Sequence, residues 1–361
     1  MYENNTIYRL SNNLRIYDNG ENEIRFRSGL WNYNEAVLDL SAETENFTKS
    51  FRKVIDNLKN NKGISVKDLD GYELNNEEKN NLISIIDSLN EAGMLCSEDE
   101  KDNDFAMSKV LLGDFSYNLN KKEENNQKLL FISDNDYAKQ TAKNLSDGMN
   151  TNLDLYSKEN IDNIISKDLT SNLDALEKKS NIEDIKNQLK DYSAILICMS
   201  HINMNLFRNI NRVSIELKKP IIMSFIDGPF ITILSTLPLK TGCLECFEQR
   251  ILSRLEDHVL YHKFIESDFK PSDKSHKSII PLLNIMTNMV ISEGFLINNF
   301  NTCKIEGRVL SIFVPTLEIQ SQDLLRVPFC PACGNISKAK LKEINISTRN
   351  IVDGILEDIN S

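Results

Sequence analysis

The fold is decided by two motifs, Cys243-Leu244-Glu245-Cys246 and, much further along the chain, Cys330-Pro331-Ala332-Cys333-Gly334. Each Cys-x-x-Cys motif places two thiolates on one tight turn, and two such turns supply the four sulfur ligands of a closed tetrahedral zinc site. Four sulfurs leave no open position for water, so we predict a structural Zn²⁺ ion that clamps the distal end of the chain. A redox Cys-x-x-Cys pair, or two unrelated turns, are the alternatives.

The segments before and between these motifs alternate between short apolar runs and helical patterns. Strands are predicted at residues 129–132, 153–156, 194–198 and 221–225, with helices at 137–145, 182–189 and 206–217. This alternation is typical of an α/β domain in which helices cover both faces of a mostly parallel, Rossmann-like sheet.

The turn after the first of these strands reads Ser133-Asp134-Asn135-Asp136-Tyr137-Ala138. A dinucleotide- or ATP-binding domain carries glycines here, so that backbone amides can approach a phosphate. This turn has no glycine and carries two negative charges, which repel phosphate. We therefore expect a degenerate nucleotide-binding architecture that binds no ATP.

The first 95 residues have a different pattern. Two alternating runs, residues 14–17 and 24–27, flank the turn Asp18-Asn19-Gly20 and predict a hairpin. A third strand is predicted at 36–40, followed by a helix at 47–58, a short helix near Val66, and a third helix that begins at Asn75 and ends at Gly93. Three strands followed by three helices predict a winged-helix-like unit.

The composition fits two soluble domains. The chain has 361 residues, of which 40% are hydrophobic and 26% charged. We predict a winged-helix-like domain at residues 1–96, a polar linker and entry segment at 97–127, and the α/β domain with the zinc site at 128–361.

The charge argues against nucleic acid as a partner. The chain carries a net charge of −11, and residues 1–95 hold eleven Lys and Arg against sixteen Asp and Glu. A DNA-reading winged helix needs the opposite balance. The start of the chain has no basic segment leading into an apolar run, and the apolar stretch at 278–297 contains Asn284, Thr287, Asn288 and Glu293. We expect a cytoplasmic protein with no membrane span, in which this stretch is a buried helix.

The remaining histidines and cysteines give weaker signals. His258 and His262 lie four residues apart and could share one helix face, but the chain has no HExxH motif there. We expect both to pack or to face solvent, as we do for His201 and His276. Cys198 ends an apolar run and is predicted to pack as a small hydrophobe, whereas Cys96 and Cys303 have no readable neighbourhood.

From about Leu129 to Gly334 the chain resembles the ubiquitin-activating, ThiF/MoeB-type fold. The resemblance lies in residues 220–228 and 241–247, which lead into the first zinc turn, and in residues 307–312 and 328–334, which lead into the second. It implies a zinc tetrad of Cys243, Cys246, Cys330 and Cys333. The departure is the turn at 133–138, which lacks the glycines of that family and puts adenylation in doubt.

A winged-helix-like unit ahead of a degenerate activating-enzyme domain resembles the C proteins of thiazole/oxazole-forming peptide cyclodehydratases. The stretch from Arg15 through Gly29-Leu30-Trp31-Asn32-Tyr33-Asn34-Glu35-Ala36-Val37-Leu38-Asp39-Leu40 is similar to the SagC type, associated with streptolysin S-like cytolysins. The resemblance implies a leader-peptide recognition element and a separate YcaO cyclodehydratase that uses ATP. It further allows a flavin-dependent azoline dehydrogenase and a second copy of the chain as partners.

The residues themselves suggest where a leader peptide could bind. An unpaired third strand offers backbone amides and carbonyls to an extended peptide, with the third helix as the other wall. Leu38, Leu40 and Ile85 are the candidate groove residues, and each could equally belong to the core. Two other functions stay open, an enzyme that adenylates a peptide or carrier carboxylate, and a non-catalytic peptide-binding regulator without a YcaO partner.

Overall fold

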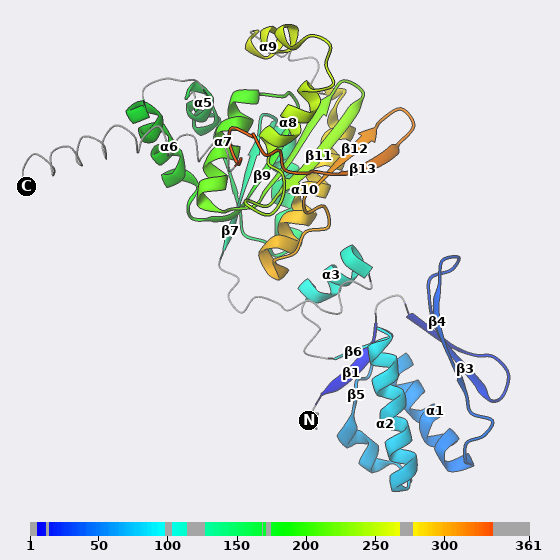
Figure 1. Ribbon diagram of the computed structural model, residues 1–361. Coiled ribbons are helices and arrows are strands. Elements are labelled where there is room, and N and C mark those ends of the chain that lie inside the picture. Colours follow the sequence, from blue (N-terminus) through cyan, green and yellow to red (C-terminus); the bar gives the residue numbers. More distant parts are fainter. Residues whose placement is uncertain are drawn as a thin grey trace, which may run out of the picture. The chain divides into compact units, whose positions relative to one another are not determined.

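The computed structural model describes residues 6–11, 14–97, 103–113, 127–167, 169–170, 175–267 and 277–334. Contacts divide the chain into two compact units, Met1–Tyr117 and Asn118–Ser361 (Figure 1). Each unit has a core of its own, and we call them unit 1 and unit 2.

Unit 1 contains two antiparallel sheets of three strands each. One has the order β5 (Ile64–Ser65), β1 (Ile7–Leu10), β6 (Leu95–Ser97), and the other the order β2 (Leu14–Asp18), β3 (Glu23–Ser28), β4 (Asn34–Asp39). The predicted strands at 14–17, 24–27 and 36–40 are confirmed as β2, β3 and β4. The predicted count of three strands was wrong, because it missed β1, β5 and β6. These strands have only four, two and three residues, too few to show an alternating pattern.

The helices of unit 1 are α1 (Glu45–Lys59), the 3-10 helix η1 (Val66–Gly71), α2 (Asn76–Glu91) and α3 (Asn103–Leu112). The short helix expected near Val66 is thus η1. The start of α2 follows the prediction, since Asn75 and Glu78 form a reciprocal capping box. One apolar face of α1, led by Phe47 and Phe51, packs with β3 and α2 to form the core of the unit.

Unit 2 is built on a seven-stranded sheet. Its order is β13 (Glu318–Asp323), β12 (Arg308–Phe313), β11 (Phe230–Thr236), β10 (Ile221–Asp227), β9 (Tyr192–Met199), β7 (Lys128–Ser133), β8 (Leu153–Leu155). The expected parallel pairing holds only from β8 to β10, and β10 to β13 are antiparallel. The reason is the connection of β10 to β11, where Gly228 and Pro229 alone link the two strands and leave room only for a hairpin.

Helices cover both faces of the sheet, as expected (Figure 1). They are α4 (Asp136–Gly148), α5 (Lys158–Ser166), α6 (Ala175–Leu189), α7 (Met204–Leu217), α8 (Leu244–Leu252), α9 (His258–Glu266) and α10 (Ile280–Phe300). Alternate residues of β7 supply two cores: Leu130 packs with α5, α6 and α7, whereas Leu129 packs with α4 and α10.

Helix α10 is the one helix in the described part of the chain that is long and apolar enough to cross a membrane. It is instead largely buried, and 56% of its most apolar window lies inside the structure. It lies so close to the sheet that a Cβ on Gly294 would approach Leu196 Cδ1 to 2.6 Å. The predicted buried helix at 278–297 is therefore confirmed as a core element of unit 2.

Candidate metal centre and strand edge

The two Cys-x-x-Cys turns come together in unit 2. Cys243 precedes α8, Cys246 lies in its first turn, and Cys330 and Cys333 follow β13. The four Sγ atoms lie within 4.8 Å of one another, with separations of 3.8 Å for 243–246, 3.6 Å for 243–330 and 3.3 Å for 246–333. Zinc–sulfur bonds of about 2.3 Å in a tetrahedron put the sulfurs about 3.8 Å apart. All four thiols are free and buried, so the cluster could hold a metal ion.

Backbone contacts hold the two turns against each other. Gly242 N donates to Leu324 O over 2.9 Å, and a Cβ at position 242 would lie 2.7 Å from that oxygen. A Cβ on Gly334 would lie 2.5 Å from Cys330 O. The amide of Val327 donates to Cys246 Sγ over 3.3 Å. Glycine at 242 and 334 therefore permits the close approach that gathers the sulfurs.

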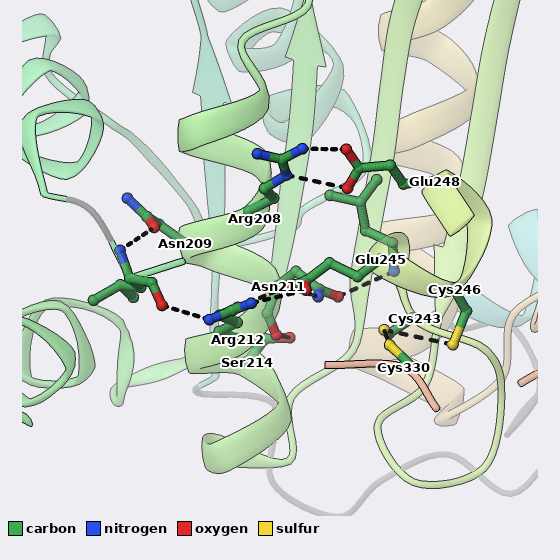
Figure 2. A network of polar contacts seen from close by, with 12 residues as sticks. Arg208, Asn209, Asn211, Arg212, Ser214, Cys243, Glu245, Cys246, Glu248 and Cys330 are labelled. Carbon is green, nitrogen blue, oxygen red and sulfur yellow. Dashed lines mark hydrogen bonds and ion pairs between the residues drawn. The ribbon is translucent and has the colours of Figure 1, made fainter. Parts of the chain in front are cut away.

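Charged pairs brace the first turn from α7 (Figure 2). Arg212 binds Glu245 with Nε–Oε1 of 2.8 Å and Nη2–Oε2 of 3.0 Å, and Arg208 Nε donates to Glu248 Oε2 over 3.1 Å. Asn211 accepts a hydrogen bond from the Leu244 amide at 3.1 Å. Because Glu245 is nearly buried, this pairing neutralises a charge that would otherwise be costly next to the sulfurs.

Hydrogen bonds among the four thiols move their pKa values apart. The contact with Cys243 lowers the pKa of Cys246 and lowers that of Cys333 to about 7, whereas contacts with Cys246 and Cys333 raise the pKa of Cys243 and of Cys330. A set of four sulfurs with no further ligand is the donor set of a closed structural site rather than of a catalytic one.

The turn after β7 contributes a carboxylate, that of Asp134, which is hydrogen-bonded to the residues that follow β9. Asp134 accepts hydrogen bonds from Ser200 N at 2.8 Å, Ser200 Oγ at 2.7 Å and His201 N at 3.2 Å. Asn135 caps α4 by accepting from the Tyr137 amide at 2.9 Å. Asp134 directly follows β7, and Ser200 and His201 directly follow β9, so all three lie at the carboxyl ends of the strands, where doubly wound sheets bind ligands. An internal anion thus uses the amide donors at the end of β9.

A cavity of about 640 Å³ opens at the carboxyl ends of β9 and β10, between α7, α8 and α9. Its wall is largely apolar and includes Phe207, Phe225, Leu244, Phe247 and Phe264. Glu248 and Tyr261 supply a polar edge, with the Tyr261 hydroxyl donating to Glu248 Oε1 over 2.9 Å. Sequence reasoning missed this cavity because its lining comes from several separate segments.

In unit 1 the three candidate groove residues meet around one core. Leu40 is only 4% exposed and belongs to that core, whereas Leu38 and Ile85 are half-buried and pack against it. The apolar side chain of β4 that faces solvent is Val37, 48% exposed, which sequence reasoning did not single out.

β4 is an edge strand: one of its sides pairs with β3, and its other side is unpaired within the described residues. At its carboxyl end, β4 is tied to α2. Thr44 Oγ1 donates to Glu78 Oε1 over 2.6 Å, and Asn81 Nδ2 donates to Glu43 Oε1 over 3.1 Å. An open strand edge and a helix are therefore joined by the loop that follows β4.

The other singled-out residues take structural places. His258 and His262 are exposed on α9, and the only cluster with metal-ligand geometry among the described residues is the cysteine tetrad. Burial raises the pKa of Cys198 and of Cys303 to about 12, and Cys198 packs in the core as expected. His276 and the tail 335–361 lie outside the described residues.

Comparison with known proteins identifies the fold. No protein-family model and no curated protein matches the sequence. The structure of the heterocyclase TruD is similar over 91% of this chain and 43% of that chain, with 14% identity and a TM-score of 0.59. A heterocyclase in complex with substrate and cofactor is similar over 92% of this chain and 40% of that chain, with 12% identity and a TM-score of 0.56. E. coli MccB with AMPCPP and MccA is similar over 91% of this chain and 100% of that chain, with 15% identity and a TM-score of 0.52.

These similarities show that the chain has the α/β fold shared by the heterocyclases and MccB. The chain spans less than half the length of the two heterocyclases, and it matches MccB over its whole length.

Proposed function

We propose that this chain is the peptide-binding, scaffolding subunit of an azole-forming cyclodehydratase. The observation that carries the proposal is the comparison with the heterocyclase TruD, in which nearly all of this chain corresponds to less than half of a longer polypeptide. In that heterocyclase this fold is joined to a larger remainder, so we propose that ring closure is carried out by a part other than this fold. We assign that role to an ATP-using YcaO cyclodehydratase.

Unit 1 is the part to which we assign leader-peptide recognition. Its β4 edge offers unpaired backbone groups of the kind that extended peptides use in strand addition. MccB, which has the same fold, has been solved together with MccA. Binding the leader here would raise the local concentration of the core peptide at the partner's active site, as tethering does for any second encounter.

The chemistry in this proposal belongs to the partner. Cys, Ser or Thr side chains of the precursor attack the preceding backbone carbonyl, and loss of water closes an azoline ring. Asp134 supports this division, because its carboxylate already uses the Ser200 and His201 amides and would repel a nucleotide phosphate. Zinc at the four cysteines would hold the two turns together and take no part in ring closure.

The finer parts of the proposal follow the sequence resemblance. The precursor would be a streptolysin S-like cytolysin peptide made in the cytoplasm, as for SagC-type proteins. A flavin-dependent dehydrogenase would oxidise azolines to azoles after this complex has acted.

Reconstitution tests the proposal. A precursor peptide, a YcaO cyclodehydratase and ATP are incubated with and without this chain, and mass spectrometry counts the water molecules lost. We expect ring formation to require this chain, and a precursor without its leader to react poorly. Equal turnover with and without this chain would rule the scaffolding role out.

A second function has one observation in its favour. The MccB structure contains the ATP analogue AMPCPP, so the fold accommodates a nucleotide in that protein. An adenylating activity of this chain would give peptide-dependent exchange of pyrophosphate into ATP. We expect no such exchange, because the turn at 133–138 has no glycine.

A further inference from the structure

The two ends of β4 differ sharply in chemistry. The turn that leads into β4, residues 29–33, carries no charge and exposes Leu30 (71%), Trp31 (88%) and Tyr33 (54%). We call these five residues the apolar tip. Val37 continues this apolar surface along the strand. Exposed apolar clusters of this kind mark contact surfaces.

The apolar tip is held rigidly. Gly29 has a φ of +84°, in the left-handed region, and a Cβ there would lie 2.3 Å from Asn32 O. The Arg27 guanidinium lies 3.8 Å from the centre of the Tyr33 ring and donates to Leu30 O over 2.9 Å. A turn whose backbone is fixed before binding loses little conformational entropy when it docks.

The carboxyl end of β4 is acidic. Asp39 accepts from the Ser41 amide at 2.9 Å, Glu43 from Asn81, and Glu78 from Thr44. We call these three carboxylates the acidic end. Hydrogen bonds lower the pKa of Asp39 and of Glu78, so both are ionised at neutral pH. In the described part of the chain, no Lys or Arg forms an ion pair with any of the three.

We infer that the segment bound along β4 is an extended stretch of the precursor's leader with an apolar, aromatic-containing end at the tip and a basic end over the three carboxylates. This inference rests on the proposed function and adds to it the substrate class and its direction. Charge complementarity decides the basic end, because Lys or Arg would pair with carboxylates that no cation among the described residues of unit 1 neutralises. The same carboxylates would repel the phosphates of a nucleic acid or a lipid surface.

The length of the strand fixes the spacing of the two anchors. β4 spans Asn34–Asp39, five steps of about 3.3 Å or about 17 Å in all. An extended peptide rises by the same amount per residue. The apolar anchor and the basic residues of the occupant should therefore be about five positions apart.

Trp31 makes the inference measurable, because it is the only tryptophan of the chain. Three synthetic strand-forming peptides serve as probes. The first carries Phe near one end and two Lys five positions away, the second has Glu in place of Lys, and the third has Ser in place of Phe. Each is titrated into the full-length chain at low salt while Trp31 emission is recorded.

We expect the Lys peptide to bind with a blue shift of Trp31 emission and the Glu peptide to bind at least about tenfold more weakly, with the difference shrinking as salt is added. The peptide without Phe should also bind weakly. Equal binding of the Lys and Glu peptides would overturn the charge assignment, and so would an affinity that does not depend on salt.

A matched pair of variants locates the basic end. Asp39→Asn with Glu43→Gln removes two charges and keeps both oxygen acceptors, and we expect it to weaken the Lys peptide about fivefold. Asp87→Asn with Glu91→Gln removes the same charge further along α2 and should leave binding unchanged. Equal losses in both variants would contradict the inference. The reconstituted turnover assay stands apart from these titrations, so a failed charge assignment and a failed scaffolding role are told apart.

Discussion

The guanidinium of Arg212 grips the carboxylate of Glu245 through two nitrogens, at 2.8 and 3.0 Å, directly beside the metal-ligand candidate Cys246. Glu245 has a side-chain exposure of only 4%. The first cysteine turn is thus anchored to α7 by a buried, two-point ion pair and to the second cysteine turn by the sulfurs. The predictions below separate these contributions.

Breaking this pair on one side should destabilise unit 2. Arg212→Ala leaves Glu245 charged and buried without its cation, with only the Asn211 side-chain amide donating to it over 3.4 Å, and such a loss costs about 3–5 kcal/mol. The double variant Arg212→Met with Glu245→Leu removes both charges and should recover most of that loss. Urea unfolding measures both values. A single variant no less stable than the double variant would contradict this account.

Removing one sulfur should remove the metal. We expect about one equivalent of zinc per wild-type chain by mass spectrometry of the metal, and almost none in Cys330→Ser, with a lower melting temperature. Cys303→Ser is the control, because Cys303 lies outside the tetrad. A Cys330→Ser protein that stayed folded and zinc-loaded but lost turnover would show that the site is catalytic instead.

The carboxylate of Asp134 should stabilise the loops at the carboxyl ends of β7 and β9. Asp134→Ala leaves the amides of Ser200 and His201 without their acceptor, and hydrogen bonds to a charged group are worth about 1.5–3 kcal/mol. We expect a loss of that order in chemical unfolding and a smaller one for Asp134→Asn, which keeps one acceptor oxygen. An unchanged unfolding free energy for Asp134→Ala would show that water replaces the carboxylate without cost.

Alkaline pH should unfold unit 2 in part through Tyr156. Burial raises the pKa of Tyr156 from its ordinary value near 10 to about 12. The folded state therefore holds this proton more tightly than the unfolded chain, so the stabilising effect is complete below about pH 10 and is lost as the pH rises towards 12. Melting temperatures from pH 8 to 12 should fall more steeply for wild type than for Tyr156→Phe. Parallel curves would exclude this tyrosine as the cause.

A methyl group at Gly29 should disturb the apolar tip. Gly29→Ala meets both the left-handed backbone, worth about 1–2 kcal/mol, and a contact of 2.3 Å with Asn32 O. Gly20 also has a positive φ, but a Cβ at that position would have no heavy atom within 4 Å, so Gly20→Ala is the control. Unfolding of each variant should show the greater loss at position 29, together with weaker binding of the Lys peptide. Equal losses would mean that the tip relaxes freely.

Local signals were the most reliable part of the sequence. The spacing of Phe47 and Phe51 and the Asn75–Glu78 capping box depend on residues a few positions apart, and both α1 and α2 follow them. The cysteine motifs predicted a cluster across a long separation because tetrahedral ligation requires four sulfurs.

Features that depend on distant partners could not be predicted in this way. The sequence shows that Asp134 is acidic but not that it accepts hydrogen bonds from Ser200 and His201, 66 and 67 positions further along. β5 and β6 are too short to show any periodicity, and β1 pairs with both. Among the groove candidates, the pattern did not distinguish enclosed Leu40 from half-buried Leu38, because residues two apart lie on the same face of a strand and only the packing of distant segments makes their exposure differ.

The carboxylate of Asp134, which is hydrogen-bonded to Ser200 and His201, also has an evolutionary consequence. A descendant of this chain that regained a phosphate cradle would need to lose the acid and to gain glycine in the same turn. Losing the acid alone strands the amides of Ser200 and His201, and gaining glycine alone leaves the negative charge in place. Neither change alone provides a phosphate site, so the two changes would have to occur together.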